Sequence, residues 1–430
     1  MATIHAPVRE TVSDVEQELL IREARRPTRR RRVGLGALVL AVLGVVSGML
    51  MTVGGGPSST PKVAGRSPGA SSSQLITPGT TLNAKSVVAL TMFTRNSGIA
   101  VNTLWNATGQ HPTMSYLTRT SNSGTTWRIT TALPRVFISP LLTFASPRVG
   151  YLADAWGEHS LFVTRDAGAT WTPMALVGEP TSITTSGDAV WVSANRCAKG
   201  LNVQSPWCPT YLTIYRLGST TPVTSRRIPA LDHALRAALP DSPRTLSARV
   251  LARTGTDSAV VVEGSDDPNS VLTTSNSGRS WTPLPSPCGQ LSVDSMVTTT
   301  SGTWLLMCTA PVGAGGANNA LYRSTNTGGS WTLVAKSNHQ GAKPNDLYGA
   351  EPDVFGANQN GSVLWFSFGV GLMQTSVNGG RTWKFSGRNL VQITQQSFVS
   401  RGTFGWLAAY EGGLMRTTDG VHWRWVRGGR

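Results

Sequence analysis

The sequence predicts an all-β fold: a seven-bladed β-propeller, with six blades as the alternative, preceded by one transmembrane helix. Two observations predict the propeller. An eight-residue phrase recurs through the last three-quarters of the 430 residues, and short apolar, β-prone segments recur at fixed places beside it. A third observation, an uncharged apolar run near the N-terminus, predicts the helix.

The repeated phrase reads Thr or Ser, any residue, Asn or Asp, any residue, Gly, any residue, Thr or Ser, Trp. Complete copies begin at residues 120, 164, 274, 324 and 376, and a shortened copy covers 417–423. The polar residue, the glycine and the tryptophan of successive copies are Asn122, Gly124, Trp127; Asp166, Gly168, Trp171; Asn276, Gly278, Trp281; Asn326, Gly328, Trp331; Asn378, Gly380, Trp383; and Asp419, Gly420, Trp423.

The spacing of the phrase gives the number of repeats. Successive tryptophans lie 40 to 52 residues apart, except for a gap of 110 between Trp171 and Trp281. That gap holds two repeats, so we expect a seventh that lacks the phrase. Each repeat also has an apolar, β-prone segment ahead of the position of the phrase. These segments are Val101–Trp105, Gly150–Asp154, Ala189–Ser193, Ala259–Glu263, Thr303–Met307, Val363–Ser367 and Gly405–Ala409.

The residue types of the phrase predict a structural role. Asn or Asp in a turn accepts hydrogen bonds from nearby backbone N–H groups, and Gly permits a positive φ. Thr or Ser adds a hydroxyl bond, and Trp buries a large ring between neighbouring blades. The alternative is a calcium site, but four of the five complete copies carry Asn, which lacks the charge that a hard cation favours. The sequence therefore predicts no metal ligands.

Residues 33–53 form the uncharged apolar run, and at 1.5 Å per residue they span roughly the ~30 Å hydrocarbon core of a membrane. The Arg-rich stretch Arg25–Arg32 precedes the run, and no charge follows it until Lys62. The positive-inside rule then predicts a cytoplasmic tail (1–32), a signal anchor (33–53), a Gly/Ser/Pro/Thr-rich linker (54–83) and an extracytoplasmic propeller (84–430) in the cell membrane. A cleaved signal peptide is the alternative. Gly44 and Gly48 have the spacing of a helix-dimerisation motif, which offers a route to a homodimer.

All four cysteines follow the apolar run, on the predicted oxidising side. An even number indicates two disulfides, and sequence order favours Cys197–Cys208 and Cys288–Cys308 among three connectivities. Metal binding by these cysteines is the alternative, but no C-x-x-C spacing or clustered His supports it.

The phrase resembles the Asp-box, or BNR repeat, of sialidases, sortilin-type receptors and the photosystem II assembly and stability factor family. The resemblance covers the predicted outer domain. It implies a β-propeller and either of two functions: glycoside hydrolysis as in sialidases, or non-enzymatic reception of a membrane protein as in the photosystem assembly family. The Arg-Ile-Pro motif of sialidases occurs as Arg227–Pro229, but after the second box rather than before the first.

No catalytic motif emerges from the residues, and we predict no catalytic or cofactor-binding residue. Outside residues 1–32 the chain carries 30 basic and 17 acidic side chains, a net charge of +13. Such a charge favours an acidic partner, either a protein or an anionic envelope polymer, and the predicted location disfavours nucleic acid. We therefore expect a binding or assembly scaffold. Sialidase activity is one alternative, and carbohydrate binding through exposed rings such as Trp156 or Trp207 is another.

Overall fold

A computed structural model describes residues 77–106, 111–155, 160–197, 208–228, 249–253, 259–262, 271–289, 291–313, 316–337, 345–350, 352–368, 372–387, 397–408 and 413–426. The chain divides between Ile76 and Thr77 into two units, and every described residue belongs to the second. The predicted tail, anchor and dimerisation glycines lie outside the described residues. Within those residues, no helix is both long and apolar enough to span a membrane.

The described strands form seven antiparallel sheets, numbered in chain order. Sheet 1 holds β1 (Thr81–Leu82), β2 (Val87–Met92), β3 (Gly98–Trp105), β4 (Pro112–Thr120) and β5 (Trp127–Ala132), with a short 3-10 helix, η1 (Ala84–Ser86). Sheet 2 holds β6 (Pro140–Phe144), β7 (Gly150–Asp154), β8 (Leu161–Thr164) and β9 (Thr172–Pro173). Sheet 3 holds β10 (Glu179–Ser186), β11 (Ala189–Asn195), β12 (Thr210–Arg216) and β13 (Pro222–Arg227).

The remaining sheets repeat this order. Sheet 4 holds β14 (Arg249–Arg253), β15 (Ala259–Val262), β16 (Val271–Thr274) and β17 (Thr282–Leu284). Sheet 5 holds β18 (Ser292–Thr298), β19 (Trp304–Gly313), β20 (Gly316–Ser324) and β21 (Thr332–Lys336). Sheet 6 holds β22 (Pro352–Ala357), β23 (Leu364–Phe368), β24 (Leu372–Ser376) and β25 (Lys384–Gly387). Sheet 7 holds β26 (Ser397–Arg401), β27 (Phe404–Ala408), β28 (Leu414–Thr417) and β29 (Trp423–Trp425).

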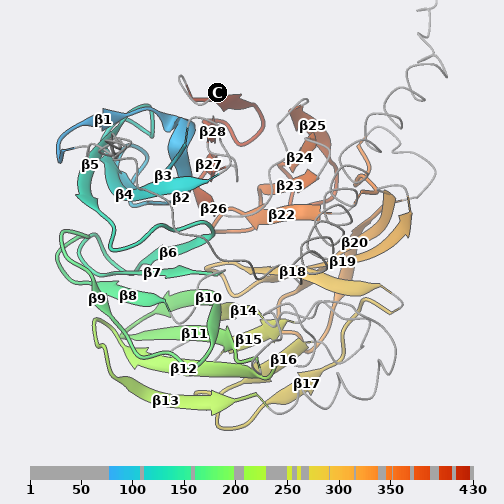
Figure 1. Ribbon diagram of the computed structural model, residues 1–430. Coiled ribbons are helices and arrows are strands. Elements are labelled where there is room, and N and C mark those ends of the chain that lie inside the picture. Colours follow the sequence, from blue (N-terminus) through green and yellow to red (C-terminus); the bar gives the residue numbers. More distant parts are fainter. Residues whose placement is uncertain are drawn as a thin grey trace, which may run out of the picture. The chain divides into compact units, whose positions relative to one another are not determined.

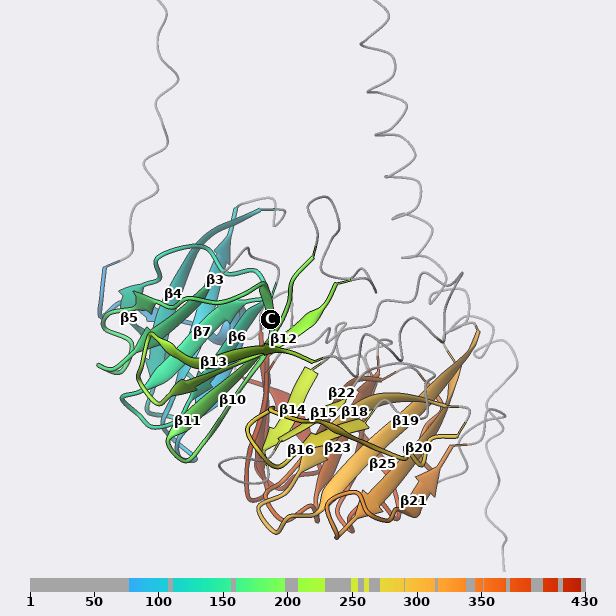
Figure 2. The same cartoon turned by 90° about the horizontal axis from the view of Figure 1, so that it is seen from below.

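The sheets follow one another around a ring. The first strands of consecutive four-stranded sheets contact each other, β2 contacts both β6 and β26, and the ring thereby closes (Figure 1). Strands that follow one another in the chain are hydrogen-bonded neighbours within their sheet, as the side-by-side strands of sheets 2 and 3 show in the view turned by 90° (Figure 2); the exception is β1, which pairs with β5 and not with β2. The fold is an all-β propeller, and its sheets correspond to the seven repeats counted in the sequence.

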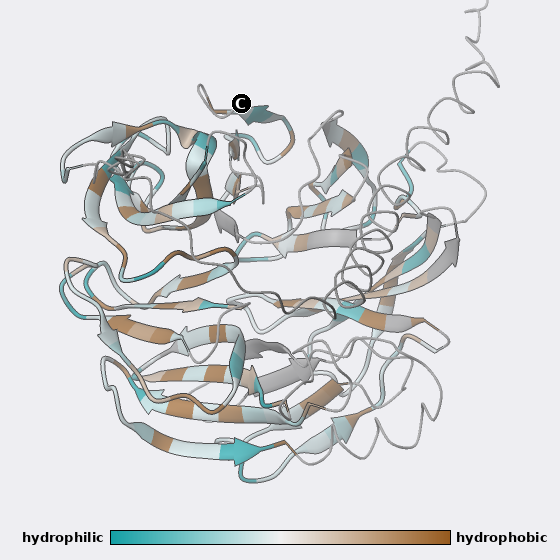
Figure 3. Ribbon diagram, viewed as in Figure 1, coloured by the Kyte–Doolittle hydropathy of each residue, from teal (hydrophilic) through white to brown (hydrophobic). Residues whose placement is uncertain are grey.

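Where burial is described, the middle strands of the sheets are the most buried and the outermost strands the least. β7 and β23 are buried along their whole length, whereas both residues of β9 are exposed. Figure 3 shows hydrophobic bands along the inner strands and a hydrophilic end on β13. The repeated apolar segments of the sequence are these second strands, because a strand flanked by two others and packed between two sheets has no face in water.

The apolar cores lie between neighbouring sheets. One core joins Ile99 and Leu117 of sheet 1 to Leu152 of sheet 2, and another joins Leu305 of sheet 5 to Phe366 of sheet 6. Each sheet is therefore stabilised by burial against its neighbours, as in other repeat architectures.

The outermost strands carry residues that discourage pairing with another chain. Pro173, Pro222 and Pro283 lie in β9, β13 and β17, and Lys336 and Lys384 lie in β21 and β25. Proline lacks a donor and an edge lysine resists desolvation, so both features protect exposed strand edges.

Sheet 1 differs from the other sheets by its extra outermost strand. Thr81 and Leu82 pair with Arg128 and Trp127 of β5. The sequence assigned these two residues to the linker because they stand among small polar residues without periodicity, whereas the structure places them in the propeller.

Candidate interaction surface

The Asp-box turns join the last two strands of six sheets. In sheet 2, Thr164 Oγ1 accepts the backbone N–H of Gly168 at 2.7 Å and donates to Asp166 Oδ1 at 2.8 Å. Asp166 Oδ1 accepts the backbone N–H of Thr170 at 2.9 Å, and Oδ2 accepts the Thr170 hydroxyl at 2.6 Å. The complete copies with an amide form the same pattern, except that Nδ2 donates to the second hydroxyl; they contain Asn122, Asn276, Asn326 and Asn378.

The hydrogen bonds predicted from the phrase are therefore present, and the amide fills the place of the carboxylate. The glycine has the predicted positive φ, for example +88° at Gly168. The residue before the glycine also has a positive φ, such as +66° at Ala167 and +55° at Thr327, which the sequence did not predict. Two consecutive left-handed residues turn the chain sharply, and the Thr or Ser hydroxyl supports the turn from inside.

Each Asp-box packs against the preceding sheet. A methyl group on Gly278 would lie 2.8 Å from Leu212 Cδ2 of sheet 3, and one on Gly124 would lie 2.6 Å from Leu414 Cδ2 of sheet 7. The box tryptophans pack in the same joints: Trp127, Trp383 and Trp423 are buried, and Trp171, Trp281 and Trp331 are half-buried. The rings lie between neighbouring sheets, three of them buried and three half-buried, and each packs toward the preceding sheet.

Arginine side chains tie the turns to the preceding sheet. Arg119 Nη2 donates to the carbonyl of Ala167 at 2.8 Å, and Arg323 Nη2 donates to that of Gly379 at 2.7 Å. Across the closing joint, Arg416 Nη1 donates to the carbonyl of Ser123 at 3.1 Å. In each case the acceptor is the residue just before the box glycine. These arginines were not predicted from the sequence, although each directly precedes the first Thr or Ser of a box, which is a signal that could have found them.

Sheet 3 lacks the phrase but keeps this joint. Gly218, with a φ of +78°, lies in the turn after β12. Arg165 Nε donates to the Gly218 carbonyl at 2.6 Å, and the Gly218 N–H donates to Tyr151 Oη at 2.6 Å. Burial raises the pKa of Tyr151, so this phenol stays neutral and serves as a structural acceptor.

The Asp-box turns lie at one end of the propeller, together with the turns that join the innermost strand of each sheet to its neighbour. This end is called the box end. The Ala167 N–H donates to the Arg148 carbonyl at 2.8 Å, and the Gly379 N–H donates to the Ser362 carbonyl at 2.8 Å. In the described turns of this end, and in the last two positions of the strand before each, the charged residues are mostly arginines: Arg95, Arg119, Arg148, Arg165, Arg216, Arg279, Arg323, Arg381, Arg401 and Arg416, against Asp166, Asp188 and Asp419.

Two of these aspartates are occupied by the turns themselves. Hydrogen bonds from the hydroxyl and backbone N–H of Thr170 lower the pKa of Asp166 to about 2. Partial burial of Asp419 works against its charge, but hydrogen bonds from His422 and Val421 outweigh it and hold the pKa of Asp419 below its usual range. By contrast, Arg148, Arg279 and Arg381 are exposed, and their guanidinium groups make no hydrogen bond or ion pair with any described residue. The box end thus presents free cations and internally bonded anions.

The opposite end carries the connections between sheets. The connection from sheet 1 to sheet 2 is fixed by Thr103, whose hydroxyl donates to the Phe137 carbonyl at 2.9 Å, and by buried Asp154, whose carboxylate accepts the N–H of Ser139 at 3.1 Å. Buried Asn319 donates through Nδ2 to the carbonyls of Tyr348 and Ala350, at 2.9 and 2.8 Å. These buried polar groups fix the connections between sheets.

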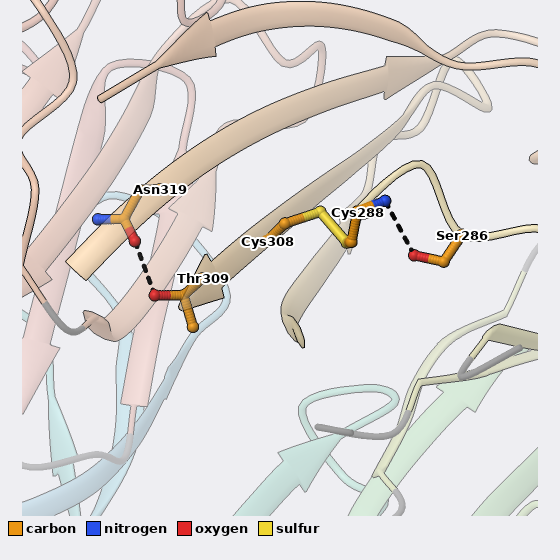
Figure 4. The surroundings of a disulfide bond; sticks show 5 residues. All are labelled: Ser286, Cys288, Cys308, Thr309 and Asn319. Carbon is orange, nitrogen blue, oxygen red and sulfur yellow. Dashed lines mark hydrogen bonds between the residues drawn. A yellow bond between two sulfur atoms is a disulfide. The ribbon is translucent and has the colours of Figure 1, made fainter. Parts of the chain in front are cut away.

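Both predicted disulfides are present, Cys197–Cys208 and Cys288–Cys308. Cys288 lies in the connection from sheet 4 to sheet 5, and Cys308 lies in β19 (Figure 4). The N–H of Cys288 donates to Ser286 Oγ at 3.2 Å, a bond within the same connection. All four cysteines therefore form disulfides that crosslink the propeller.

No cluster of metal-ligating side chains emerges from the described residues. Among them, no group of three or more His, Cys, Asp or Glu side chains could hold a metal ion. Arg227, from the sialidase-like tripeptide, lies at the end of outermost strand β13, while Pro229, Trp156 and Trp207 lie outside the described residues. The predicted box residues are brought together within each turn, and the turns are distributed around the ring.

The chain matches no protein-family model and no curated protein. Solved structures do match. The structure of YCF48 bound to a D1 peptide has a TM-score of 0.48 at 16% identity, over 80% of this chain and 97% of that one. YCF48 from Cyanidioschyzon merolae has a TM-score of 0.44 at 18% identity, over 68% and 86%. The GH74 xyloglucanase from Xanthomonas campestris has a TM-score of 0.36 at 14% identity, over 80% of this chain and 47% of that one. No activity or partner of this chain follows from these likenesses.

Proposed function

We propose that this protein is a non-enzymatic binding scaffold whose box end receives an acidic partner. The observation that carries the proposal is the charge of that end, where exposed Arg148, Arg279 and Arg381 stand free while Asp166 and Asp419 are bonded within their own turns. A guanidinium group can bind a carboxylate through two parallel hydrogen bonds, which favours recognition of acidic side chains. The rigid joints described above hold these arginines on a fixed frame.

A binding assay with an acidic peptide tests the proposal. The probe is a fluorescently labelled poly-glutamate peptide, and the readout is anisotropy at several salt concentrations. We expect binding that weakens with salt, because exposed charges are screened over ~10 Å at 0.1 M. The triple variant Arg148→Glu, Arg279→Glu, Arg381→Glu should bind roughly tenfold more weakly, because three exposed ion pairs at about 0.5 kcal/mol each amount to ~1.5 kcal/mol.

A matched control separates a local site from the net charge of the protein. Arg135, Arg196 and Arg226 are also exposed but lie in a connection, after β11 and in outermost strand β13. Replacing these three with Glu changes the net charge equally. An equal loss of binding in both triple variants would show that binding depends on the net charge of the protein and not on the arginines of the box end. A sulfated or phosphorylated polysaccharide bound in preference to the peptide would identify an envelope polymer rather than a protein as the partner.

The membrane topology predicted from residues 33–53 is part of the same proposal, since it places the box end outside the cytoplasm. Protease shaving of intact cells should digest the propeller, and full protection would overturn that orientation. Turnover of a fluorogenic sialoside by the purified protein would contradict the non-enzymatic character. YCF48 has been solved with a D1 peptide bound, and a peptide is likewise the first class of partner to test here.

A further inference from the structure

The joint between sheets 7 and 1 differs from the other joints of the ring. Sheet 7 consists of β26–β29 and sheet 1 of β1–β5. Among the described strands, therefore, no C-terminal strand joins sheet 1 and no N-terminal strand joins sheet 7. The other joints each have a chain connection that leads from one sheet into the next. Among the described residues, the contacts across this joint include two made by side chains: Trp406 Nε1 donates to the Ser123 carbonyl at 3.1 Å, and the Arg95 guanidinium lies 4.0 Å from the ring centre of Phe404.

Residues 77–86, called the strap, reach this joint through Ala84. The strap begins at the outer edge of sheet 1, where Gly79 donates to the Ile129 carbonyl and the Ile129 N–H donates to the Thr80 carbonyl, both at 2.9 Å. It then leads from outermost β1 through η1 to innermost β2. Ala84, in η1, is 0% exposed and packs in one core with Trp406 and Leu414 of sheet 7.

The strap is also bonded to the middle of sheet 1. Asn102 on β3 is 0% exposed, and its Nδ2 donates to Ser86 Oγ at 2.8 Å. Its Oδ1 accepts the hydroxyl of Thr118. Without Ser86 the buried amide would lose a hydrogen-bond acceptor, which is costly in a dry core. The strap thus contributes apolar Ala84 to the core shared with sheet 7, and its Ser86 completes the buried hydrogen bonds of Asn102 in sheet 1.

We propose that the strap is the closing device of the ring: seated, it holds sheets 1 and 7 together, and released, it opens this joint while the other joints stay closed. The strap directly follows Ile76, where the first unit of the chain ends. Because the strap is the first described segment of the chain, a pull on the chain ahead of residue 77 acts on the strap first. Opening would separate Arg95 and Arg416 from their partners on the opposite sheet, and so alter the box end.

Hydrogen–deuterium exchange of the full chain tests this device. The variant Ala84→Arg removes the apolar contact with sheet 7, and Ser86→Ala removes the acceptor of Asn102 while leaving the apolar contact. We expect exchange to rise roughly tenfold in Ala84→Arg for residues 79–86 and 404–417, since local opening determines exchange. Residues 304–324 should change little. Ser86→Ala should raise exchange in the same places by a smaller factor.

The control is Lys85→Ala, in the same short helix but exposed, which should leave exchange as in the parent protein. Two outcomes overturn the proposal. In the first, residues 404–417 exchange at the parent rate in both strap variants, which means that the strap does not close the joint. In the second, residues 304–324 speed up as much as 404–417, which means that the variants lower the stability of the whole ring instead of opening one joint.

Discussion

Replacing Gly328 with Ala tests whether the Asp-box glycine is needed for packing as well as for the turn. Gly328 has a φ of +86°, and a methyl group there would lie 2.6 Å from Leu284 Cδ1 and 2.9 Å from Trp304 Cζ3. A left-handed φ costs a residue with a Cβ roughly 1–2 kcal/mol. Forcing a methyl group into a filled joint costs about 1–3 kcal/mol more, because the leucine can rotate but the buried indole of Trp304 has little room.

Gly302 is the matched control in the same sheet. Its φ is +78°, and a methyl group there would meet no atom within 4 Å. The variant Gly302→Ala therefore keeps the backbone cost and the reduced entropy of the unfolded chain but lacks the clash. We expect Gly328→Ala to lower the free energy of unfolding by about 2 kcal/mol more than Gly302→Ala does.

Urea denaturation followed by tryptophan fluorescence measures this difference, provided that the slopes of the transitions agree among the three proteins. Equal midpoints for the two variants would refute the reasoning, because they would show that the box glycine serves its turn alone. A larger loss in Gly302→Ala would equally contradict a close contact between the box and the preceding sheet.

Three further predictions concern single interactions. The folded pKa of Asp166, about 2, lies below its ordinary value of 3.8. The charged Asp166 carboxylate therefore stabilises the fold above about pH 4, and this stabilisation is lost as the pH falls towards 2. The thermal midpoint of the Asp166→Asn variant should therefore fall less than that of the parent protein between about pH 4 and about pH 2. Trp383 Nε1 donates to a carbonyl whereas buried Trp331 Nε1 has no partner among the described residues, so Trp383→Phe should cost about 1 kcal/mol more in urea denaturation than Trp331→Phe. Replacing Cys288 and Cys308 together with Ala opens a loop with a sequence separation of 20 and should lower the free energy of unfolding by about 3 kcal/mol; an unchanged urea midpoint would contradict this expectation.

The turns and inner strands could be predicted from the sequence because their determinants are local. The bonds of Asp166 reach Thr164 and Thr170, at most four residues away, and the segment Gly150–Asp154 is a strand with the bounds that its apolar character indicated. A phrase of eight residues contains its own hydrogen-bonding partners. The disulfide order was also predictable, since both bridges link cysteines that are neighbours in the sequence.

The joints could not be predicted in the same way, because their partners lie far apart in the sequence. Arg119 donates to a carbonyl 48 residues away, and Arg323 to one 56 residues away. The acceptor is a backbone group that every residue possesses, so no residue type marks it. The same reason explains why Thr81–Leu82 resembled linker: β1 is fixed by backbone pairing with β5, and two residues are too few to show an alternation.

Sheet 3 shows which feature of the joints is shared. Its turn has no Asp-box, yet Gly218 presents its carbonyl to Arg165 of the preceding sheet from a left-handed backbone, as Gly379 presents its own to Arg323. Tyr151 of the preceding sheet even accepts the N–H of Gly218, a bond across the joint that supports the turn from outside. What the ring requires at these joints is therefore a tight turn that offers a carbonyl to the neighbouring sheet. The Asp-box is a compact way to build such a turn from its own residues, and this explains why Asn serves in it as well as Asp.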